Sequence, residues 1–234
     1  MIFVENRKKS KKTLAKLYPN AEVIDLTSRG KEPFVRLSPF YPHGNIPVPF
    51  SQNIFAYSVE GIWQALKVFE HQDIDISKFE IQDMKGIKRT VRKFGKALGH
   101  RKGIQGTELL DYLTARKQIY LPSYAWLLQN VVVTEVELIK DKALTNDVIF
   151  LDFGTNGDIE DLSKPLSHAA LVKRFLEKKY PELMLTRFTQ PIPKKLRKPR
   201  KTSSQKKEKS NNKKPSRGKK KQTTIEGQFT LNLD

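Results

Sequence analysis

The chain of 234 residues contains no cysteine. This absence excludes a disulfide framework, thiolate metal sites and a cysteine nucleophile, and it is compatible with a reducing compartment. Other metal ligands are also sparse, because His43, His71, His100 and His168 form no close pair and no HExxH spacing occurs. The sequence therefore predicts neither a bound metal nor a cofactor.

Long apolar runs are missing as well. No stretch approaches the roughly 18 residues that a membrane-spanning helix requires, and charged residues between Glu5 and Lys9 interrupt the N-terminus where a signal peptide would be apolar. We therefore expect a protein without a membrane partner that stays inside the cell. Its compartment would be the nucleus in a eukaryote or a eukaryotic virus, and the cytoplasm otherwise.

Acidic residues are scarce where basic residues gather. The formal net charge is +19, and residues 194–221 hold fifteen Lys or Arg against the single acid Glu208. Apolar residues nearly vanish between 191 and 221, a composition typical of a disordered segment. We therefore expect one globular domain over residues 1–190, a disordered Lys/Arg-rich linker over 191–221 that binds DNA or RNA, and a short peptide at 222–234.

Hydrophobic periodicity predicts an α+β domain that is mainly helical and contains a small sheet. The runs at 23–26 and 147–153 predict strands, whereas 131–136 fits either a strand or the end of a helix. Four prolines between Ser38 and Phe50 exclude a helix there and predict an ordered loop or an edge segment. Helices are expected at residues 58–69, 84–98, 107–118, 123–130 and 167–179.

The helix expected at Ser58–Phe69 is apolar around most of its circumference. Ser58 is the expected N-cap, and Glu60 places a carboxylate in the first turn. At about 100° per residue, Glu60, Gln64 and Lys67 fall in one narrow polar arc. This arc is either a thin solvent-facing strip on a core helix or the wall of a cleft that binds a polar ligand.

Two further regions carry candidate functional residues. The strand at 147–153 leads into a polar loop with Asp152, Asn156 and Asp158, a common place for chemistry, although loops of this composition are also ordinary. A basic group on the second expected helix and in the turn that follows it is a candidate for binding phosphate or nucleic acid, with a lysine-rich solvent face as the alternative. Its members are Lys88, Arg89, Arg92 and Arg101. The sequence contains no P-loop, dinucleotide fingerprint or GxSxG elbow.

Three stretches of the sequence together resemble the NADAR superfamily of N-glycosidases. They are SPFYPHGNIPV at 38–48, SVEGIWQALK at 58–67 and LDFGTNGD at 151–158. Four residues match the family's lead-in, with Pro39 in place of an asparagine: Ser38, Phe40, Tyr41 and Pro42. Four more match its helix: Ser58, Glu60, Gln64 and Lys67. The resemblance covers about residues 34–178, and its first half is the specific part.

The resemblance implies a NADAR-like fold and hydrolysis of an N-glycosidic bond to ribose 5-phosphate or ADP-ribose, including ADP-ribose attached to guanine in nucleic acid. Cleavage gives the sugar oxocarbenium character, which a carboxylate such as Glu60, Asp152 or Asp158 would stabilise or use to direct water. Lys67 would hold the phosphate or the leaving base, and Gln64 would orient a ribose hydroxyl. The remaining substrate-binding candidates are Ser38, Phe40, Tyr41, Trp63 and Asn156. The alternative is a non-catalytic, DNA-associated binding protein.

The C-terminal stretch KKKQTTIEGQFTL resembles a clamp-interacting (PIP) box. Gln222, Ile225 and Phe229 stand in the order of that motif, and Gln228 occupies the place of its first aromatic residue. Such a peptide inserts an aliphatic and an aromatic side chain into one pocket of a sliding clamp, and basic residues just upstream help its approach. The sequence therefore predicts a sliding clamp as a partner.

Overall fold

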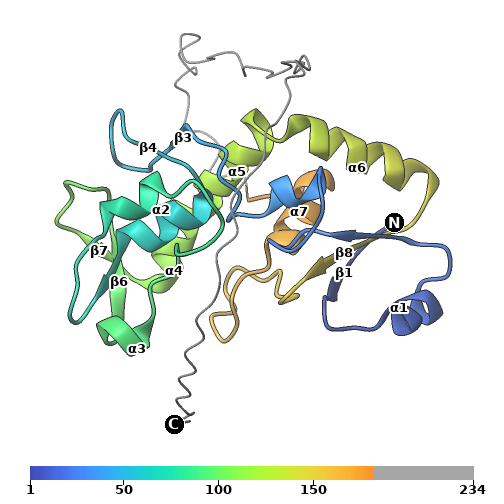
Figure 1. Cartoon of the computed structure of the whole chain (residues 1–234), viewed down its shortest axis with the longest axis horizontal. Coiled ribbons are helices and arrows are strands. Elements are labelled where there is room, and N and C mark those ends of the chain that lie inside the picture. The colour runs from blue at the N-terminus through green and yellow to red at the C-terminus, as the bar shows by residue number, and fades with distance from the viewer. Residues whose placement is uncertain (182–234) are drawn as a thin grey trace, which may run out of the picture. The chain divides into compact units, whose positions relative to one another are not determined.

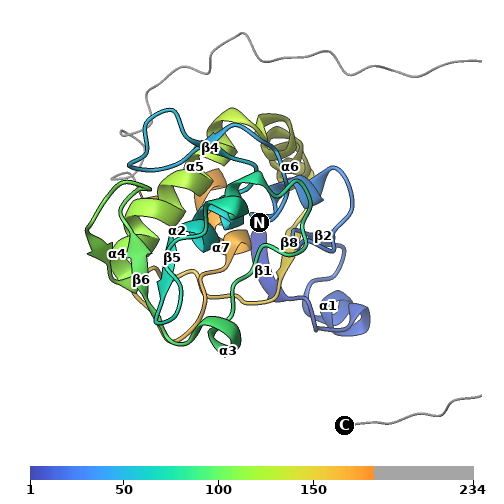
Figure 2. The same cartoon turned by 60° about the vertical axis from the view of Figure 1, so that its left-hand side comes forward.

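The structure, a computed structural model, describes residues 1–181 and has an α+β fold. A parallel three-stranded sheet is formed by β1 (Ile2–Asn6), β8 (Val148–Asp152) and β2 (Glu22–Asp25), with β8 in the middle. Because β8 pairs on both edges, its apolar run is buried. The strands expected at 23–26 and 147–153 correspond to β2 and β8. Figure 2 shows the three strands side by side, with α1 (Lys11–Leu17) beside one end of the sheet.

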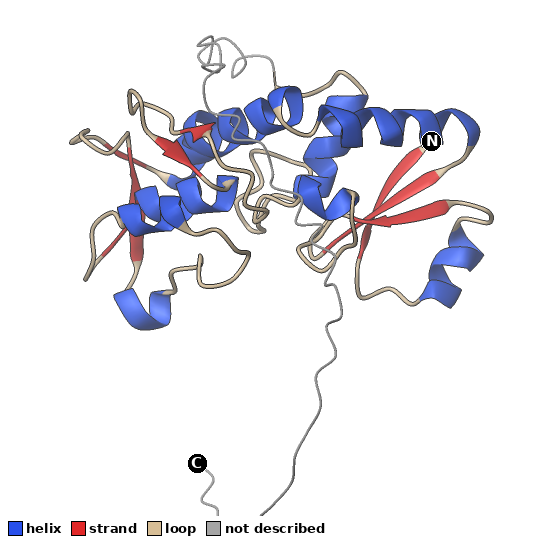
Figure 3. Cartoon of the chain, turned by 45° about the horizontal axis from the view of Figure 1, so that its top comes forward, coloured by secondary structure: helices blue, strands red, loops and turns tan. Residues whose placement is uncertain are grey.

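Two smaller antiparallel sheets lie at the other side of the described domain (Figure 3). One joins β3 (Ile46–Pro47) to β4 (Phe55–Ala56), and the other has the order β5 (Lys67–Phe69), β6 (Ala97–Arg101), β7 (Leu109–Leu110). The prediction of an ordered edge segment at 38–50 is confirmed, because the proline-containing strand β3 pairs on one side only.

The middle of the domain, between the sheets, is helical (Figure 1). All eight residues of α2 (Val59–Leu66) are buried, and its N-cap is Ser58, whose Oγ accepts the amide of Gly61 at 3.0 Å. The second central helix, α5 (Leu121–Asn130), packs against α2, while α7 (His168–Leu176) packs against β1 and β8. The remaining elements are η1 (Phe34–Leu37), η2 (Ile76–Glu80), α3 (Val91–Phe94), α4 (Tyr112–Ala115), the π-helical turn η3 (Arg116–Tyr120) and α6 (Val133–Thr145).

Several helix boundaries differ from those expected. The helix at 58–69 ends at Leu66, and Lys67 begins β5. The helix expected at 107–118 begins only after its N-cap Asp111, since Leu109 and Leu110 form β7. The segment 131–136, expected to be either a strand or the end of a helix, is helical from Val133. The helix expected at 167–179 is confirmed as α7, capped by Ser167.

The prediction of a helix at 84–98 is wrong. Only α3 is helical there, Gly95 ends it with a φ of 79°, and β6 follows. At Gly99 a Cβ atom would lie 2.4 Å from the carbonyl oxygen of Leu110, so this glycine permits the close approach of β7 rather than capping a helix. Strand pairing on both edges of β6 thus overrides the helical spacing of the sequence.

The linker at 191–221 and the clamp-binding peptide at 222–234 lie outside the described residues. Within residues 1–181, no helix combines the length and the apolar character needed to cross a membrane.

Candidate active site

A cavity of about 590 Å³ lies where α2, the end of β8 and the helical stretch from α4 to η3 meet. Its wall combines two carboxylates, three cations and a set of aromatic rings from segments far apart in the sequence. The carboxylates are Glu60 and Asp152, and the cations are Lys88, Arg116 and Lys164. The aromatic residues are Phe40, Trp63, Tyr112, Tyr120 and Phe153. We call this cavity the α2 pocket.

Glu60 lies in the first turn of α2 and is 8% exposed. Gln64, one turn later, donates from Nε2 to Oε1 of Glu60 at 2.8 Å, and its own Oε1 accepts the amide of Arg89 at 3.0 Å, which fixes the orientation of the side-chain amide. Within residues 1–181, Gln64 is the one hydrogen-bond donor to this carboxylate. The second oxygen of Glu60, Oε2, is therefore the one available to a ligand in the α2 pocket.

Burial raises the pKa of Glu60, and the hydrogen bond from Gln64 and the positive charges of Lys88, Lys67 and His168 only partly oppose it. The site thus disfavours the charged form of this carboxylate. Such a carboxylate interacts strongly with positive charge that develops nearby.

Asp152, at the end of β8, is fully occupied by protein donors. Its Oδ2 accepts from Ser167 Oγ at 2.7 Å and pairs with Nδ1 of His168 at 3.0 Å, while its Oδ1 accepts the amide of Phe153 at 2.7 Å. Burial raises the pKa of Asp152, but the positive charge of His168 and these hydrogen bonds outweigh it, and the net shift is downward. Asp152 is therefore ionised and is not free to act as a base.

His168 forms an ion pair with Asp152 at the start of α7. Its Nε2 lies 2.8 Å from the carbonyl oxygen of Leu26, so both ring nitrogens face acceptors, the arrangement that suits a protonated imidazole. Burial lowers the pKa of His168, but Asp152 and the Leu26 carbonyl raise it by more. The pair ties α7 to β8 in the wall of the α2 pocket, which both residues line.

Arg116 is the buried cation of the α2 pocket, at 2% exposure. Its NH1 donates to the carbonyl oxygens of Ile159 at 2.8 Å and Asp161 at 2.9 Å, and its NH2 donates to that of Lys164 at 3.2 Å. These contacts hold the loop after β8 against η3. NH2 also donates to the hydroxyl of Tyr112 at 3.4 Å, so both terminal nitrogens are bonded to protein acceptors. No carboxylate forms an ion pair with Arg116 in the described part of the chain, so it adds a net positive charge to the wall.

Aromatic rings supply the apolar part of the wall. The ring of Trp63 packs on His100 with centroids 3.7 Å apart, and it meets Tyr120 edge to face at 5.7 Å. Burial, followed by the charges of Lys67 and Arg89, lowers the pKa of His100 to about 3, so this ring is neutral. Burial, followed by the charges of Glu60 and Asp152, raises the pKa of Tyr120 well above its usual value, so its hydroxyl keeps its proton.

The α2 pocket brings together six residues singled out from the sequence: Phe40, Glu60, Trp63, Lys88, Asp152 and Asn156. Asn156 shapes the loop, because its Nδ2 donates to the carbonyl oxygens of Asp161 and Lys164. Gln64 lies behind Glu60, and Lys67 places its Nζ 5.9 Å from the Trp63 ring centroid, outside the wall.

Other candidates lie away from the α2 pocket. Ser38 is buried, with its Oγ accepting the amide of Phe40 at 3.3 Å, and the hydroxyl of Tyr41 donates to Glu32 at 3.1 Å. Asp158 is exposed and accepts the amide of Glu160 at 2.9 Å.

The predicted basic group is not assembled at one place. Arg89 is buried and donates to the carbonyl oxygens of Gln64, Lys67 and Asp73. Arg101 pairs with the carboxylate of Asp73 at 2.7 Å, and Arg92 is exposed on α3. Of this group only Lys88 lines the α2 pocket.

Several wall residues were not identified from the sequence as functional, among them Tyr112, Arg116, Tyr120, Phe153, Lys164 and His168. Arg116 and Tyr120 bound the π-helical turn η3, which periodicity at 3.6 residues per turn does not reveal. No local signal marked Arg116, because Thr114, Lys117 and Gln118 lie close to it in the sequence and give this stretch the composition of a solvent-facing surface.

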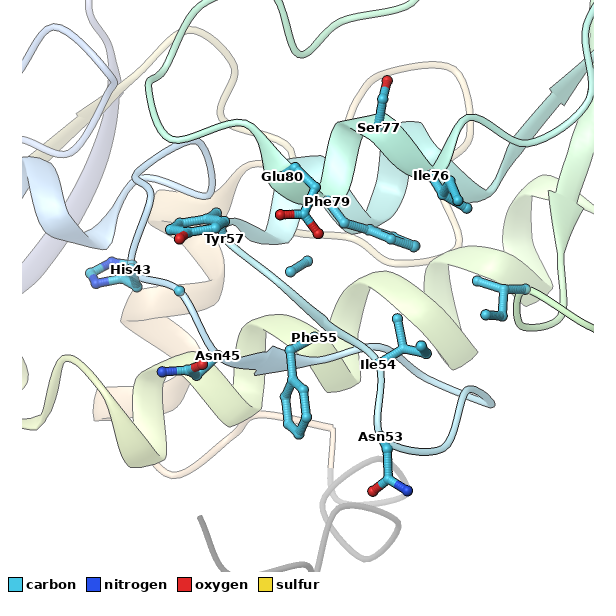
Figure 4. A pocket seen from close by; sticks show the side chains of 13 residues that line it. His43, Asn45, Asn53, Ile54, Phe55, Tyr57, Ile76, Ser77, Phe79 and Glu80 are labelled. Atoms are coloured by element: carbon cyan, nitrogen blue, oxygen red, sulfur yellow. The ribbon is translucent and has the colours of Figure 1, made fainter. Parts of the chain in front are cut away.

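A second cavity, of about 840 Å³, lies between the β3–β4 hairpin and η2 (Figure 4). His43 points its Nε2 at the carbonyl oxygen of Arg36, 2.7 Å away, and burial lowers the pKa of its ring. The lining includes one carboxylate, Glu80, and no Lys or Arg. This cavity therefore lacks the pairing of carboxylate with cations that distinguishes the α2 pocket.

Within residues 1–181, no three His, Cys, Asp or Glu side chains gather closely enough to hold a metal ion. A family model with the description "Family of unknown function (DUF6939)" matches residues 6–172 of the chain. This segment contains every residue that lines the α2 pocket. No curated protein matches the chain.

Proposed function

Because the chain belongs to the DUF6939 family, whose description assigns no activity, we propose a function from the α2 pocket: hydrolysis of an N-glycosidic bond between a base and a phosphate-bearing ribose. Substrates of this class include ribose phosphates and ADP-ribosyl groups, among them ADP-ribose on guanine in nucleic acid. The resemblance to the NADAR superfamily in the first half of the domain supports the same reaction.

The observation that carries the proposal is Glu60, with one carboxylate oxygen held by Gln64 and the other available to the α2 pocket. Cleavage of an N-glycosidic bond places positive charge on the anomeric carbon and ring oxygen of the sugar. A buried carboxylate stabilises that charge more in the transition state than in the ground state, and it also accepts a proton from the attacking water. Glu60 takes both roles.

The cations of the wall would bind the phosphate of the substrate. Arg116 presents a buried guanidinium without a carboxylate partner in the described chain, and Lys88 and Lys164 lie exposed at the rim. The ammonium groups of Lys88 and Lys164 bind phosphate oxygens by charge-assisted hydrogen bonds, and the buried charge of Arg116 adds electrostatic attraction. In this proposal Lys88 has the phosphate-binding role that the resemblance gives to Lys67.

The rings of Trp63 and Phe40 offer apolar faces to the base, while the neutral hydroxyl of Tyr120 donates a hydrogen bond to the sugar. The Asp152–His168 pair does not touch the reacting atoms and keeps α7 and the loop after β8 in place. Exclusion of water by the rings strengthens the interaction of Glu60 with the sugar.

The test is release of ADP-ribose or ribose phosphate from a panel of N-ribosyl substrates, with the Glu60→Gln variant compared to the wild type. We expect kcat to fall by about 10²–10³-fold with little change in KM, because the amide keeps the contact to Gln64 and loses the charge. Asp158→Asn, which removes an exposed carboxylate outside the α2 pocket, is the matched control and should keep full activity.

Full activity of Glu60→Gln would contradict the role of this residue. Tight binding of the same ligands without turnover by the wild type would instead favour the alternative, a non-catalytic binding protein.

Clamp binding through residues 222–234 is a separate proposal, supported by the spacing of Gln222, Ile225 and Phe229 alone. A peptide covering residues 219–234 should bind a sliding clamp and lose binding when Ile225 and Phe229 are both replaced by alanine.

A further inference from the structure

Phe153 is a half-exposed aromatic residue at the rim of the α2 pocket. It follows β8 directly, lines the pocket and is 51% exposed. Its amide donates to Asp152 Oδ1 at 2.7 Å, and its carbonyl oxygen accepts from Asn6 Nδ2 at 2.8 Å. Both sides of its backbone are thus fixed to the ends of neighbouring strands, and its ring is held in place while remaining open to solvent.

Two guanidinium groups lie against this ring. Arg7 and Arg29 place their Cζ atoms 5.9 and 5.8 Å from the ring centroid of Phe153. Arg7 is held by Asp25, whose Oδ2 accepts from its Nε at 2.8 Å. Arg29 is exposed and forms no ion pair within residues 1–181. The group therefore presents an aromatic face together with at least one uncompensated positive charge.

A hollow of about 740 Å³ on the far side of these arginines is basic. The cations that line it are Arg7, Lys9, Lys11, Arg29 and Lys31. Its three acids already have partners: Asp25 pairs with Arg7, Glu22 pairs with Lys142 at 2.7 Å, and Glu32 accepts from Tyr41. Phe153 lines the α2 pocket and contacts two arginines of the hollow. It therefore lies between the α2 pocket and the basic hollow.

We propose that Phe153, Arg7 and Arg29 form a platform for single-stranded nucleic acid, so that the α2 pocket acts on a nucleotide within a strand. The inference rests on the proposed function, since it names the form in which that substrate arrives. A base next to the nucleotide in the α2 pocket stacks on Phe153, and its phosphates lie against Arg29 and the hollow beyond. An aromatic face beside cations fits a nucleobase with its phosphates, whereas an acidic peptide supplies the charge without the flat face.

This platform differs from the basic group expected from the sequence. Arg89 and Arg101 are committed to protein carbonyl and carboxylate groups, and Arg92 lies on α3. The platform instead uses the C-terminal ends of β1 and β8 and the turn after β2, which the parallel sheet brings to one edge.

The experiment measures binding of a labelled oligothymidylate of about 12 nucleotides, a length within the range of a single-stranded site, to the full chain at several salt concentrations. Phe153→Ala should weaken binding about tenfold, as expected for loss of one stacked base. Arg29→Ala should reduce the slope of log K against log salt by about 0.7, the loss of one phosphate contact.

Each variant has a matched control in the same chain. Phe55→Ala removes a ring that is 44% exposed on β4, and Arg92→Ala removes one exposed guanidinium, so both controls should leave affinity and salt slope unchanged. Phe153→Trp should restore binding and report it through quenching of the new indole, which also shows that the fold at this position is intact.

Equal losses in Phe153→Ala and Phe55→Ala, or an unchanged salt slope in Arg29→Ala, would overturn the platform. Competition by a polyglutamate peptide that equals that of the oligonucleotide would also overturn it. Because the readout is binding of an unmodified strand, an inactive α2 pocket does not affect this result. Conversely, turnover of free nucleotides without strand binding would leave the proposed hydrolysis standing and remove the platform.

Discussion

At Glu60, the burial on which its proposed catalytic role depends also opposes ionisation of the carboxylate in the folded protein. Its pKa is raised in the folded state, so its contribution to stability is fully present below the unfolded value of about 4.3. That contribution is lost as the pH rises through the folded pKa. Raising the pH from about 4 to 7 therefore lowers the stability that Glu60 gives the fold.

We therefore predict that Glu60→Gln is more stable than the wild type at pH 7, by about 1 kcal/mol or 2–4 °C in Tm. The difference should disappear as the pH falls towards 4, because both side chains are then neutral. Thermal unfolding of both proteins across this pH range checks it. A variant that is less stable at pH 7 would mean that the charge of Glu60 is well compensated in the folded state.

The Asp152–His168 pair leads to the opposite expectation for Asp152→Asn. In the wild type, the raised pKa of His168 means that its stabilisation is complete below about pH 6.5 and is lost as the pH rises through the folded pKa. The lowered pKa of Asp152 adds stability above about pH 3.9, which is lost as the pH falls through its folded value. Between these limits the pair stabilises the fold.

Asp152→Asn leaves His168 buried without its carboxylate, and we expect it to cost about 3 kcal/mol at pH 6. Burial then lowers the pKa of His168, so the variant should become more stable as the pH rises from 6 to 8, whereas the wild type becomes less stable. Denaturant unfolding at several pH values measures this change of sign. Asp158→Asn serves as the exposed control, and parallel pH profiles for all three proteins would refute the prediction.

Sequence reasoning located part of this site because side-chain type and local spacing are enough to place some residues. Glu60 follows a serine N-cap in an apolar helix, and Asp152 ends a buried strand, so both positions are determined by local signals. Arg116 and Tyr120 depend on a π-helical turn and on contacts with residues more than 40 positions away, such as the bond from Arg116 to the carbonyl of Ile159. Local patterns carry no information on such contacts.

At the scale of elements, the segment 84–96 shows why the helix expected there does not form. Arg89 reaches inward and donates to carbonyl oxygens of Gln64, Lys67 and Asp73, which joins this segment to the end of α2 and to β5. Two strands of the parallel sheet, β2 and β8, and helix α7 were predictable from apolar runs and caps, whereas β1 and the parallel pairing were not identified. The path of 84–101 was not predictable either, since it is set by this one buried side chain and by strand pairing of β6.

We predict that Arg89→Ala destabilises the protein by about 3 kcal/mol, or about 10 °C in Tm, because three carbonyl groups lose their donor. Arg92→Ala, three residues later on the exposed surface, should change stability by less than about 0.5 kcal/mol. Thermal melts of the two variants make the comparison. Similar stabilities would show that the bonds of Arg89 contribute little, and a loss in Arg92→Ala would point to a partner for that residue.

At the scale of the whole molecule, the proposed catalytic and electrostatic functions belong to different parts of the sequence. The α2 pocket lies within residues 6–172, whereas fifteen cations fall within 194–221. The platform contacts one strand locally, while the C-terminal cations would add affinity that does not depend on sequence. Shortening the chain should therefore remove the contribution of the C-terminal cations and keep that of the platform.

A chain shortened to residues 1–190 should bind DNA with a much weaker salt dependence than the full chain. If about half of the fifteen cations contact phosphates, the slopes of log K against log salt differ by about 5. Turnover of a free nucleotide substrate should be the same for both lengths, which serves as the control for folding. Equal slopes would place the electrostatic contact in the folded domain.

The π-helical turn η3 makes the number of residues before α5 important for the site. A turn of this kind holds one residue more than an α-helical turn and joins α4 to α5 without a break. Removing that residue would rotate everything before it by about 100° relative to α5, so α5 would keep its core contacts while Arg116 would leave the wall that it shares with Tyr120. The number of residues between the Asp111 cap and α5 thus becomes a marker that separates family members able to build this site from those that retain only the scaffold.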